Sequence, residues 1–268
     1  MFYRRYLSRM TSHGTRNLAA AALFATLLPL AAARGEDRPS TPVPSRGLDL
    51  LTHTRLRLPK YDKSLLNCVS CHADGGTNPQ ALPWTGVAAK YPRYNPRAGR
   101  VLDLADRVNE CFRRSLNGEA LPKKSPAMMD ILAYLSSLPK TPTTKAAGAS
   151  AADRVGPADE PAGARLYAQR CARCHGKDGA GLRDPDDDPD GEIPPLWGPG
   201  SFNLGAGMAR LHTLERFIRA NMPQGAACNL TAQEARDVAA FVAFQPRPDF
   251  PDKSADWPKG GKPVDARY

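Results

Sequence analysis

Apolar side chains recur at helical spacing in several short segments of this 268-residue chain. In residues 102–122 one face of such a helix carries Leu104, Val108, Cys111, Phe112 and Ser115. Asp103 precedes this run as a typical N-cap, and Asn117-Gly118 follows it as a stop signal. The pattern predicts a helix with Cys111 on its inward face.

Two further helices are predicted at corresponding places in the two halves of the chain. Residues 130–139 ("DILAYLSSLP") and 237–246 ("DVAAFVAFQP") each begin with Asp, carry an aromatic residue four positions later and end on Pro. The shared residues are Asp130, Tyr134 and Pro139 in the first half and Asp237, Phe241 and Pro246 in the second. Residues 162–176 predict another helix, in which Leu166 and Tyr167 pack against a neighbouring helix. We interpret the two halves as an internal repeat.

Each half also contains the sequence Cys-x-x-Cys-His, in "NCVSCH" (67–72) and "RCARCH" (170–175). Two thiols three residues apart can add to the two vinyl groups of a haem, and the adjacent His can ligate the iron. The sequence therefore predicts two covalent haem c groups, held by Cys68, Cys71 and His72 and by Cys171, Cys174 and His175. A zinc site would need paired Cys and His sets that converge on one metal, and no partner sets occur in the sequence.

Composition and charge narrow the class of protein. Frequent Pro (26) and Gly (22) with few aromatic residues favour small helical domains with long loops around the haems. The formal net charge is +10, and the four arginines among residues 1–33 leave 10 − 4 = +6 for the remainder. Without a helix-turn-helix, an aromatic platform or a Lys/Arg tract, this charge does not indicate nucleic-acid binding. It fits an anionic small substrate or an acidic redox partner better.

The N-terminus predicts export. A basic stretch up to Arg16 precedes the apolar run "LAAAALFATLLPLAAA", and Ala31-Ala32-Ala33 is a cleavage site of the A-x-A type. We expect a signal peptide over residues 1–33, cleaved near Ala33, and a periplasmic mature chain. The apolar run is short for a membrane span, so no transmembrane span is expected in the mature chain.

The remaining boundaries follow from composition. Residues 140–160 are rich in Ala, Thr, Gly and Pro without periodicity and predict a flexible linker. The predicted domains are 34–139 and 161–249, followed by a tail at 250–268. An acidic segment, "DPDDDPDGE" at 184–192, matches the start of a calcium loop, but Trp197 stands where the bidentate Glu belongs. A solvated acidic loop is therefore favoured over a calcium site.

The distal ligands of the two irons are expected to differ. In the second half Met222 lies 47 residues after His175 and directly before a Pro, and is favoured over Met208. Met128 and Met129 are candidates in the first half, but both lie next to its terminal helix. Cys111 leaves three interpretations open, which are a small buried apolar residue, a disulfide with Cys228, and an iron-ligating thiolate.

Basic residues surround Cys111. Arg107 and Ser115 lie one helical turn to either side of it, and Arg97 and Arg100 directly precede the helix, which predicts an anion pocket. Four neighbouring cations are expected on a solvated face, namely Arg113, Arg114, Lys123 and Lys124.

The haem motifs and helices resemble class I cytochrome c domains. That resemblance implies an all-α fold of two tandem domains, each with three to five helices around one haem and with Pro83 or Pro195 beside its His. Over about 60–268 the chain also resembles the dihaem thiosulfate dehydrogenases, through "RVNECFRRSLNG", "GPGSFNLGAGM", "FIRANMP" and "DWPKGGKPVDARY".

The second resemblance implies an activity and roles for named residues. The family oxidises two thiosulfates to tetrathionate, and some members run chiefly in reverse. It implies Cys111 and Met222 as distal ligands of the first and second haem. It implies Arg97, Arg107 and Ser115 in the substrate pocket, and a soluble or membrane-bound cytochrome as electron acceptor. Some members exchange a Lys for the methionine on reduction; here that position is Asn221, so no such switch is expected. Two other functions stay open, an electron-transfer cytochrome without a substrate and a subunit of a sulfur-oxidising complex.

Overall fold

The computed structural model describes residues 41–141, 156–182, 192–224 and 229–268, which all belong to one compact unit. The predicted signal peptide, most of the predicted linker, residues 184–191 of the acidic segment, and Cys228 lie outside the described residues. No helix within the described part of the chain is long and apolar enough to cross a membrane.

The described residues are mainly helical, as predicted, with one small two-stranded sheet. The first half contains α1 (Pro44–Thr52), α2 (Thr54–Arg57), α3 (Ala73–Gly76), strands β1 (Arg93–Asn95) and β2 (Arg100–Leu102), α4 (Leu104–Arg114) and α5 (Pro126–Ser137). The second half contains α6 (Glu160–Arg170), α7 (Ala172–His175), α8 (Leu211–Asn221) and α9 (Ala232–Phe244). Single-turn 3₁₀ helices complete the described structure at Cys68–Ser70, Ala88–Lys90, Gly207–Ala209 and Lys253–Ala255.

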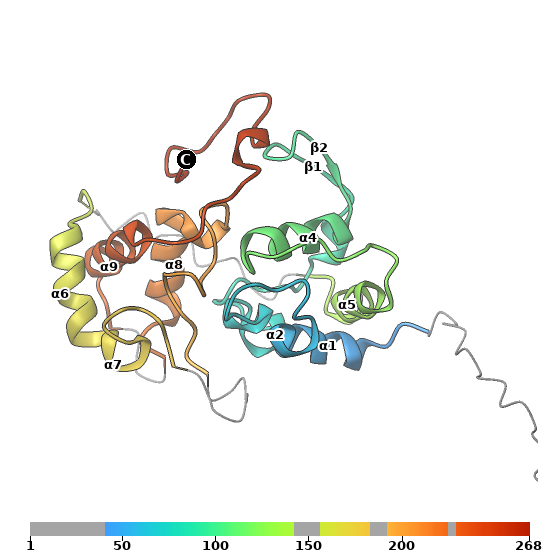
Figure 1. Ribbon diagram of the computed structural model, residues 1–268, viewed down its shortest axis with the longest axis horizontal. Helices are drawn as coiled ribbons and strands as arrows, with labels where there is room; N and C mark the ends of the chain where they lie inside the picture. The colour runs from blue at the N-terminus through green and yellow to red at the C-terminus, as the bar shows by residue number, and fades with distance from the viewer. Residues whose placement is uncertain (1–40, 142–155, 183–191, 225–228) are drawn as a thin grey trace, which may run out of the picture. The chain divides into compact units, whose positions relative to one another are not determined.

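Each half is organised around one pair of packed helices. Helix α1 packs against α5, and α6 packs against α9 (Figure 1). The repeated aspartates join each pair, because Asp130 Oδ1 accepts the Val43 N–H at 2.7 Å and Asp237 Oδ1 accepts the Asp159 N–H at 2.9 Å. These two N–H groups precede the first turns of α1 and α6, where a helix leaves its donors without intrahelical partners.

A glycine allows the close approach of the two helices in each pair. A Cβ at Gly47 would lie 2.1 Å from the Asp130 carbonyl oxygen, and one at Gly163 would lie 1.9 Å from that of Asp237. Both distances are far below a van der Waals contact. The repeated Asp and an unpredicted Gly therefore act at the same crossing in both halves.

The helix that carries Cys111 begins where the sequence predicts. Asp103 is the N-cap of α4, and its side chain accepts the Asp106 N–H. The antiparallel β1–β2 hairpin leads directly into this helix. Helix α4 ends at Arg114, and Asn117 adopts a positive φ of 48°, a left-handed conformation that Asn tolerates after a helix.

Several predicted boundaries were wrong. Helix α5 begins at Pro126 rather than at Asp130, because Ser125 caps it and Pro126 suits its first turn. Helix α9 begins at Ala232, where Thr231 and Glu234 form a capping box. The helix predicted over 162–176 is divided into α6 and α7 at Cys171, so the second haem motif occupies a separate turn.

Replacing Gly163 by Ala should destabilise the second half. The added methyl group would meet backbone atoms of α9, so the helices must separate, and overpacking of this kind costs about 1–3 kcal/mol. Denaturant unfolding of the variant measures this loss. Gly207→Ala is the matched control, because its Cβ would have no neighbour within 4 Å. Equal stability of both variants would contradict the crossing described here.

Candidate functional site

The first Cys-x-x-Cys-His motif forms a single 3₁₀ turn that leads into α3. Thr54 of α2 supports the turn, because its hydroxyl donates to Cys68 Sγ at 3.2 Å and accepts the Cys68 N–H at 3.3 Å. Burial raises the pKa of both Cys68 and Cys71 to about 12. The two thiols are thus neutral at pH 7.

Both motif histidines are held in the form that binds a metal. His72 Nδ1 contacts the Leu82 carbonyl oxygen, and His175 Nδ1 lies 3.1 Å from the Pro194 carbonyl oxygen. Because a carbonyl can only accept, Nδ1 carries the proton and Nε2 keeps its lone pair for a metal. Burial lowers the pKa of His72 to about 4 and also lowers that of His175, so both rings are neutral at pH 7.

These contacts give Pro83 and Pro195 a specific role. In each half the accepting carbonyl belongs to the residue directly before the proline. A tertiary X–Pro amide has no N–H, and its ring restricts the backbone at this point. The resemblance to class I cytochromes implied a proline beside each His. In the structure, the His ring contacts the carbonyl of the residue before that proline.

Aromatic rings support the turn that follows each histidine. The Trp84 ring centroid lies 4.6 Å from that of His72, and the Tyr134 ring meets Trp84 edge-on. The Tyr134 hydroxyl donates to the Gly75 carbonyl at 2.7 Å. This contact explains why the first repeat requires an aromatic residue at 134.

The second half reaches the same arrangement with different residues. Tyr167 of α6 donates to the Gly176 carbonyl at 2.7 Å, and its ring packs against Trp197 and Phe241. The hydroxyl therefore comes from the first helix of the pair in this half and from the last helix in the other. Tyr167 is buried, as predicted for a residue at a helix–helix contact.

A cavity of about 740 Å³ adjoins the second motif. Its walls include Cys171, Cys174, His175, Met208 and Met222 together with many apolar side chains. Cofactor clefts are on the order of 300–1,000 Å³ and mainly apolar. Two thiols, a neutral imidazole and a thioether in an apolar cavity fit a covalently bound haem.

Met208 and Met222 both face this cavity, so Met222 as the distal ligand stays a prediction. Met222 is the C-cap of α8, and its N–H donates to the Ile218 carbonyl. Asn221 beside it donates to the Gln80 carbonyl of the first half at 3.1 Å. Met128, a first-half candidate, is fully buried in the core formed by α5.

The same cavity extends to the first motif. Leu66, Ser70 and Cys71 contribute to its walls along with His175. The two predicted haem-attachment segments therefore border one space.

Cys111 lies on α4 near the first motif and is a free cysteine. Arg107 Nη1 donates to Cys111 Sγ at 3.0 Å, and the interaction with Cys111 raises the pKa of Arg107. Cys111 also helps to raise the pKa of Cys71, and Arg107 helps to lower that of His72. A thiol and a half-buried guanidinium thus face the first haem-attachment residues from one helix.

Ser115 continues this face of the helix. It is the C-cap of α4, half-buried, and its N–H donates to the Cys111 carbonyl at 2.7 Å. Arg100 is placed differently, because its side chain is 56% exposed and pairs with Asp106 at the surface. The predicted roles of Arg97, Arg107, Cys111 and Ser115 toward a substrate stay predictions.

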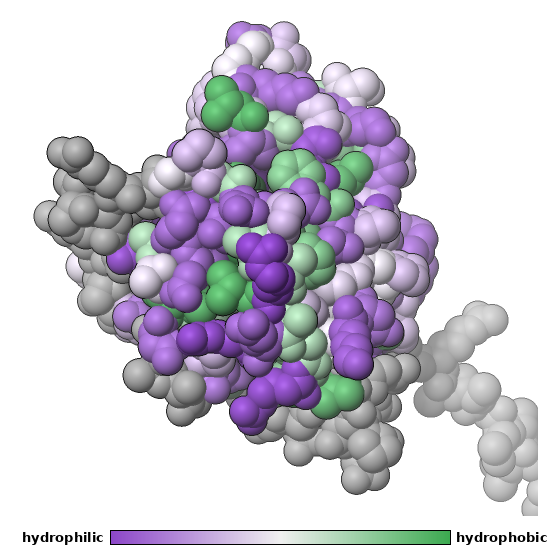
Figure 2. Space-filling view, turned by 90° about the vertical axis from the view of Figure 1, so that its left-hand side faces the viewer, coloured by the Kyte–Doolittle hydropathy of each residue, from purple (hydrophilic) through white to green (hydrophobic). Residues whose placement is uncertain are grey.

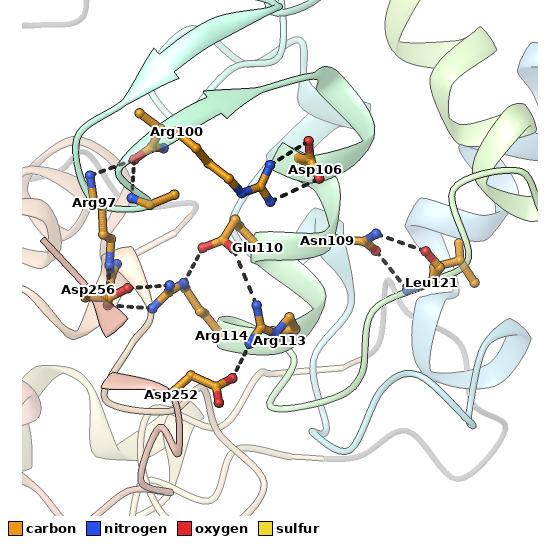
Figure 3. Close-up of polar contacts among 12 residues, drawn as sticks. Arg97, Arg100, Asp106, Asn109, Glu110, Arg113, Arg114, Leu121, Asp252 and Asp256 are labelled. Carbon is orange, nitrogen blue, oxygen red and sulfur yellow. Dashed lines mark hydrogen bonds and ion pairs between the residues drawn. The ribbon is translucent and has the colours of Figure 1, made fainter. Parts of the chain in front are cut away.

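Arg97 is engaged by the C-terminal tail. Its Nε donates to Asp256 Oδ2 at 2.7 Å (Figure 3). Its Nη2 contacts the Tyr268 hydroxyl, and its guanidinium lies over the Trp257 ring. The Trp257 N–H donates to the Arg97 carbonyl at 2.8 Å. The tail therefore fixes both the backbone and the side chain of this arginine.

The prediction that Arg114 lies on a solvated face was wrong. Its side chain is 8% exposed and stacks on Phe250. It donates to both oxygens of Asp256 at 2.8 and 2.9 Å (Figure 3). Glu110 Oε2 accepts a hydrogen bond from Arg114 Nε. The sequence placed Arg114 outside because the tail residues that cover it are 136 or more positions away.

The other three cations are exposed or half-exposed. Arg113 pairs with Asp252 of the tail, and Lys123 pairs with Asp103 and Asp106. Lys124 is exposed.

Asp256 is the residue of this region that sequence reasoning missed. Burial opposes its ionisation, but hydrogen bonds from Arg114, Tyr268 and Arg97 outweigh burial and hold its pKa below its ordinary value. The one available signal was the tail motif "DWPKGGKPVDARY", in which Asp256 stands first.

Two family models match the chain. The model described as "SoxA/TsdA, cytochrome c domain" matches residues 60–141, and "Cytochrome C oxidase, cbb3-type, subunit III" matches residues 158–242. Each matched range contains one Cys-x-x-Cys-His motif. They agree with two cytochrome c domains in tandem.

Curated relatives and a solved structure extend this similarity over most of the chain. A thiosulfate dehydrogenase of Allochromatium vinosum is 42% identical over 221 residues, covering 79% of this chain and 80% of the relative. One from Psychrobacter arcticus is 38% identical over 226 residues, covering 83% and 68%. A solved thiosulfate dehydrogenase (TsdBA) from Marichromatium purpuratum, in its as-isolated form, is 34% identical with a TM-score of 0.68. That match covers 78% of this chain and 46% of the solved one.

Asp256→Asn should destabilise the protein strongly. Breaking a buried ion pair on one side costs about 3–5 kcal/mol, and the Asp256 side chain is only 3% exposed beside the buried Arg114. Thermal or denaturant unfolding measures the change. Asp252→Asn is the control, because the Arg113–Asp252 pair is at the surface and such pairs contribute about 0–1 kcal/mol. The account of the tail would be wrong if the two substitutions had equal effects.

Proposed function

The chain belongs to the thiosulfate dehydrogenase family, and on that premise we propose that it oxidises two thiosulfate ions to tetrathionate in the periplasm. The observation that carries the proposal is the contact of Arg107 with Cys111 at 3.0 Å beside the first haem motif. An electron-transfer cytochrome without a substrate has no need for a half-buried cation at this position.

Two covalent haems are part of the proposal. Cys68, Cys71 and His72 would hold one, and Cys171, Cys174 and His175 the other, with Cys111 and Met222 as their distal ligands. When bound, each haem can accept one electron, so two haems match the two electrons of the reaction.

The arginine addresses the main electrostatic obstacle. Two thiosulfate dianions must approach one another before their sulfurs can bond, and in a poorly solvated site their repulsion is strong. The Arg107 guanidinium offers a fixed positive charge and several N–H donors to an oxyanion. It can therefore offset the repulsion and orient the substrate.

Cys111 supplies a nucleophile for a covalent route. Its thiolate bonds the sulfane sulfur of one thiosulfate, giving Cys111–S–S–SO₃⁻ and releasing two electrons. A second thiosulfate then attacks the sulfane sulfur, forming tetrathionate and returning the Cys111 thiolate. In sum, two S₂O₃²⁻ give S₄O₆²⁻ and two electrons, and no proton is taken up or released.

The electrons must leave to a partner, for which we propose a soluble or membrane-bound cytochrome. The face seen in Figure 2 is largely hydrophilic, with apolar side chains scattered among polar ones. A surface of this kind favours transient contacts over a permanent apolar interface.

The isolated protein should oxidise thiosulfate with ferricyanide as acceptor. Steady-state absorbance at the ferricyanide band measures the rate, and chromatography identifies tetrathionate as the product. An inert protein that still exchanges electrons with ferricyanide would support a pure electron-transfer cytochrome instead.

Arg107→Ala should lower thiosulfate turnover about ten- to hundredfold, because one charge-assisted contact contributes about 1.5–3 kcal/mol. Haem content, measured by mass and absorbance, should change little. Arg100→Ala is the matched control, since that arginine is exposed and its pair with Asp106 is at the surface. If both variants lose activity equally, the anion pocket at α4 is wrong.

Cys111→Gly should remove a thiolate-type low-spin signal from the paramagnetic resonance spectrum of the oxidised protein. The signal of the other haem should remain, because its attachment residues lie on α7 and at its N-cap, and its cavity does not include Cys111. Identical spectra before and after the substitution would show that Cys111 only fills space in the core.

A further inference from the structure

A buried carboxylate links the two haem-attachment segments. The Glu192 side chain is 10% exposed and pairs with Arg55, which is 16% exposed. Its other oxygen accepts from Asn67 Nδ2 at 3.3 Å. The partners are 137 and 125 residues away in sequence, so Glu192 joins one half of the chain to the other.

On the first side, both partners of Glu192 shape the turn that bears the haem thiols. Asn67 directly precedes Cys68, and its backbone N–H donates to Ser70 Oγ at 3.0 Å. Its side-chain oxygen accepts the Arg55 N–H at 3.1 Å. Arg55 itself follows Thr54, whose hydroxyl donates a hydrogen bond to Cys68 Sγ.

On the second side, Glu192 lies two residues before Pro194, whose carbonyl accepts from His175. Ile193 between them exchanges two hydrogen bonds of 2.9 Å with Leu182, which fixes this strand-like segment. Glu192 also lines the cavity of the second motif, together with Ser70 of the first. A short path of contacts therefore runs from Cys68 through Asn67 and Glu192 to the segment that orients His175.

We infer that Glu192 is a positioning residue that holds the two haem-attachment segments in the arrangement needed for electron transfer between the haems. The inference rests on the proposed function in that it requires two bound haems. Electron transfer between fixed centres falls steeply with their separation, so a charge-assisted contact between the two segments has direct kinetic consequences. Its buried location makes the contact stronger than an ion pair at the surface.

The test uses the full chain with both haems bound. Glu192→Gln keeps the shape and the Asn67 contact but removes the charge that Arg55 requires. Inter-haem electron transfer is followed by absorbance after photochemical one-electron reduction, which involves no thiosulfate. We expect unchanged haem content and a rate about tenfold lower, the factor that corresponds to about 1.4 kcal/mol.

Two comparisons make the result specific. Glu119→Gln removes a surface carboxylate that pairs with Lys63, and should leave the rate unchanged. Arg55→Gln should slow transfer like Glu192→Gln, and the double variant should be no slower than either alone, since both remove the same contact. If Glu192→Gln does not bind both haems, Glu192→Asp is used instead, because it keeps the charge but withdraws the carboxylate from Arg55 by one methylene, and it should also slow transfer.

Inter-haem transfer at the wild-type rate in the Glu192 and Arg55 variants would overturn the inference. That result is separate from the proposed activity. Wild-type protein that transfers electrons between its haems but leaves thiosulfate unchanged would contradict the proposed function alone, and Glu192 would keep its role.

Discussion

Each half of this protein depends on one hydrogen bond between the imidazole of its haem motif and a backbone carbonyl. The bond fixes the proton on Nδ1, and burial keeps the ring neutral, so Nε2 is available to iron. Pro83 and Pro195 hold the accepting carbonyls, while Trp84 packs on His72 in the first half and Tyr167 supports the corresponding turn in the second. The crossing of two helices at a Gly and an Asp supplies the frame for these parts.

The two halves share the helix crossing and the His–carbonyl contact, but they differ in the side chains that lie near the haem motif. In the first, α4 presents a thiol and a guanidinium to the haem-attachment residues, which is a charged and nucleophilic environment. In the second, two thioethers and an apolar wall surround the His, which suits storage and export of an electron. Under the proposed function, the first half would carry the chemistry and the second half would pass the electrons out.

Local patterns in the sequence predicted most of this frame. The Cys-x-x-Cys-His motifs, the N-cap Asp103 and the repeated Asp130 and Asp237 are recognised within a few residues of chain. Helix α1 was not predicted, although the Val43 N–H at its start is the hydrogen-bond partner of Asp130. A search of each half for a Gly-containing helix that precedes the repeated Asp would have found α1. Boundaries failed where capping residues lie outside the apolar run, as at Ser125 and Thr231.

Long-range contacts could not be predicted in this way. The sequence gives no sign that the tail covers Arg114 or that Glu192 reaches Arg55, because nothing in the local pattern of either segment identifies a partner more than a hundred residues away. These contacts decide which arginines are solvated, so the assignment of cations around Cys111 was the weakest part of the prediction. Arg107 was placed correctly on the helical face of Cys111, since residues four apart on a helix must be neighbours.

The account is tested most directly by mixing the oxidised protein with excess thiosulfate in the absence of any acceptor and following haem absorbance. One turnover releases two electrons, so the account predicts reduction of both haems and the formation of one tetrathionate per chain. Spectra that stay fully oxidised, with no tetrathionate formed, in a protein that dithionite reduces normally, would contradict it.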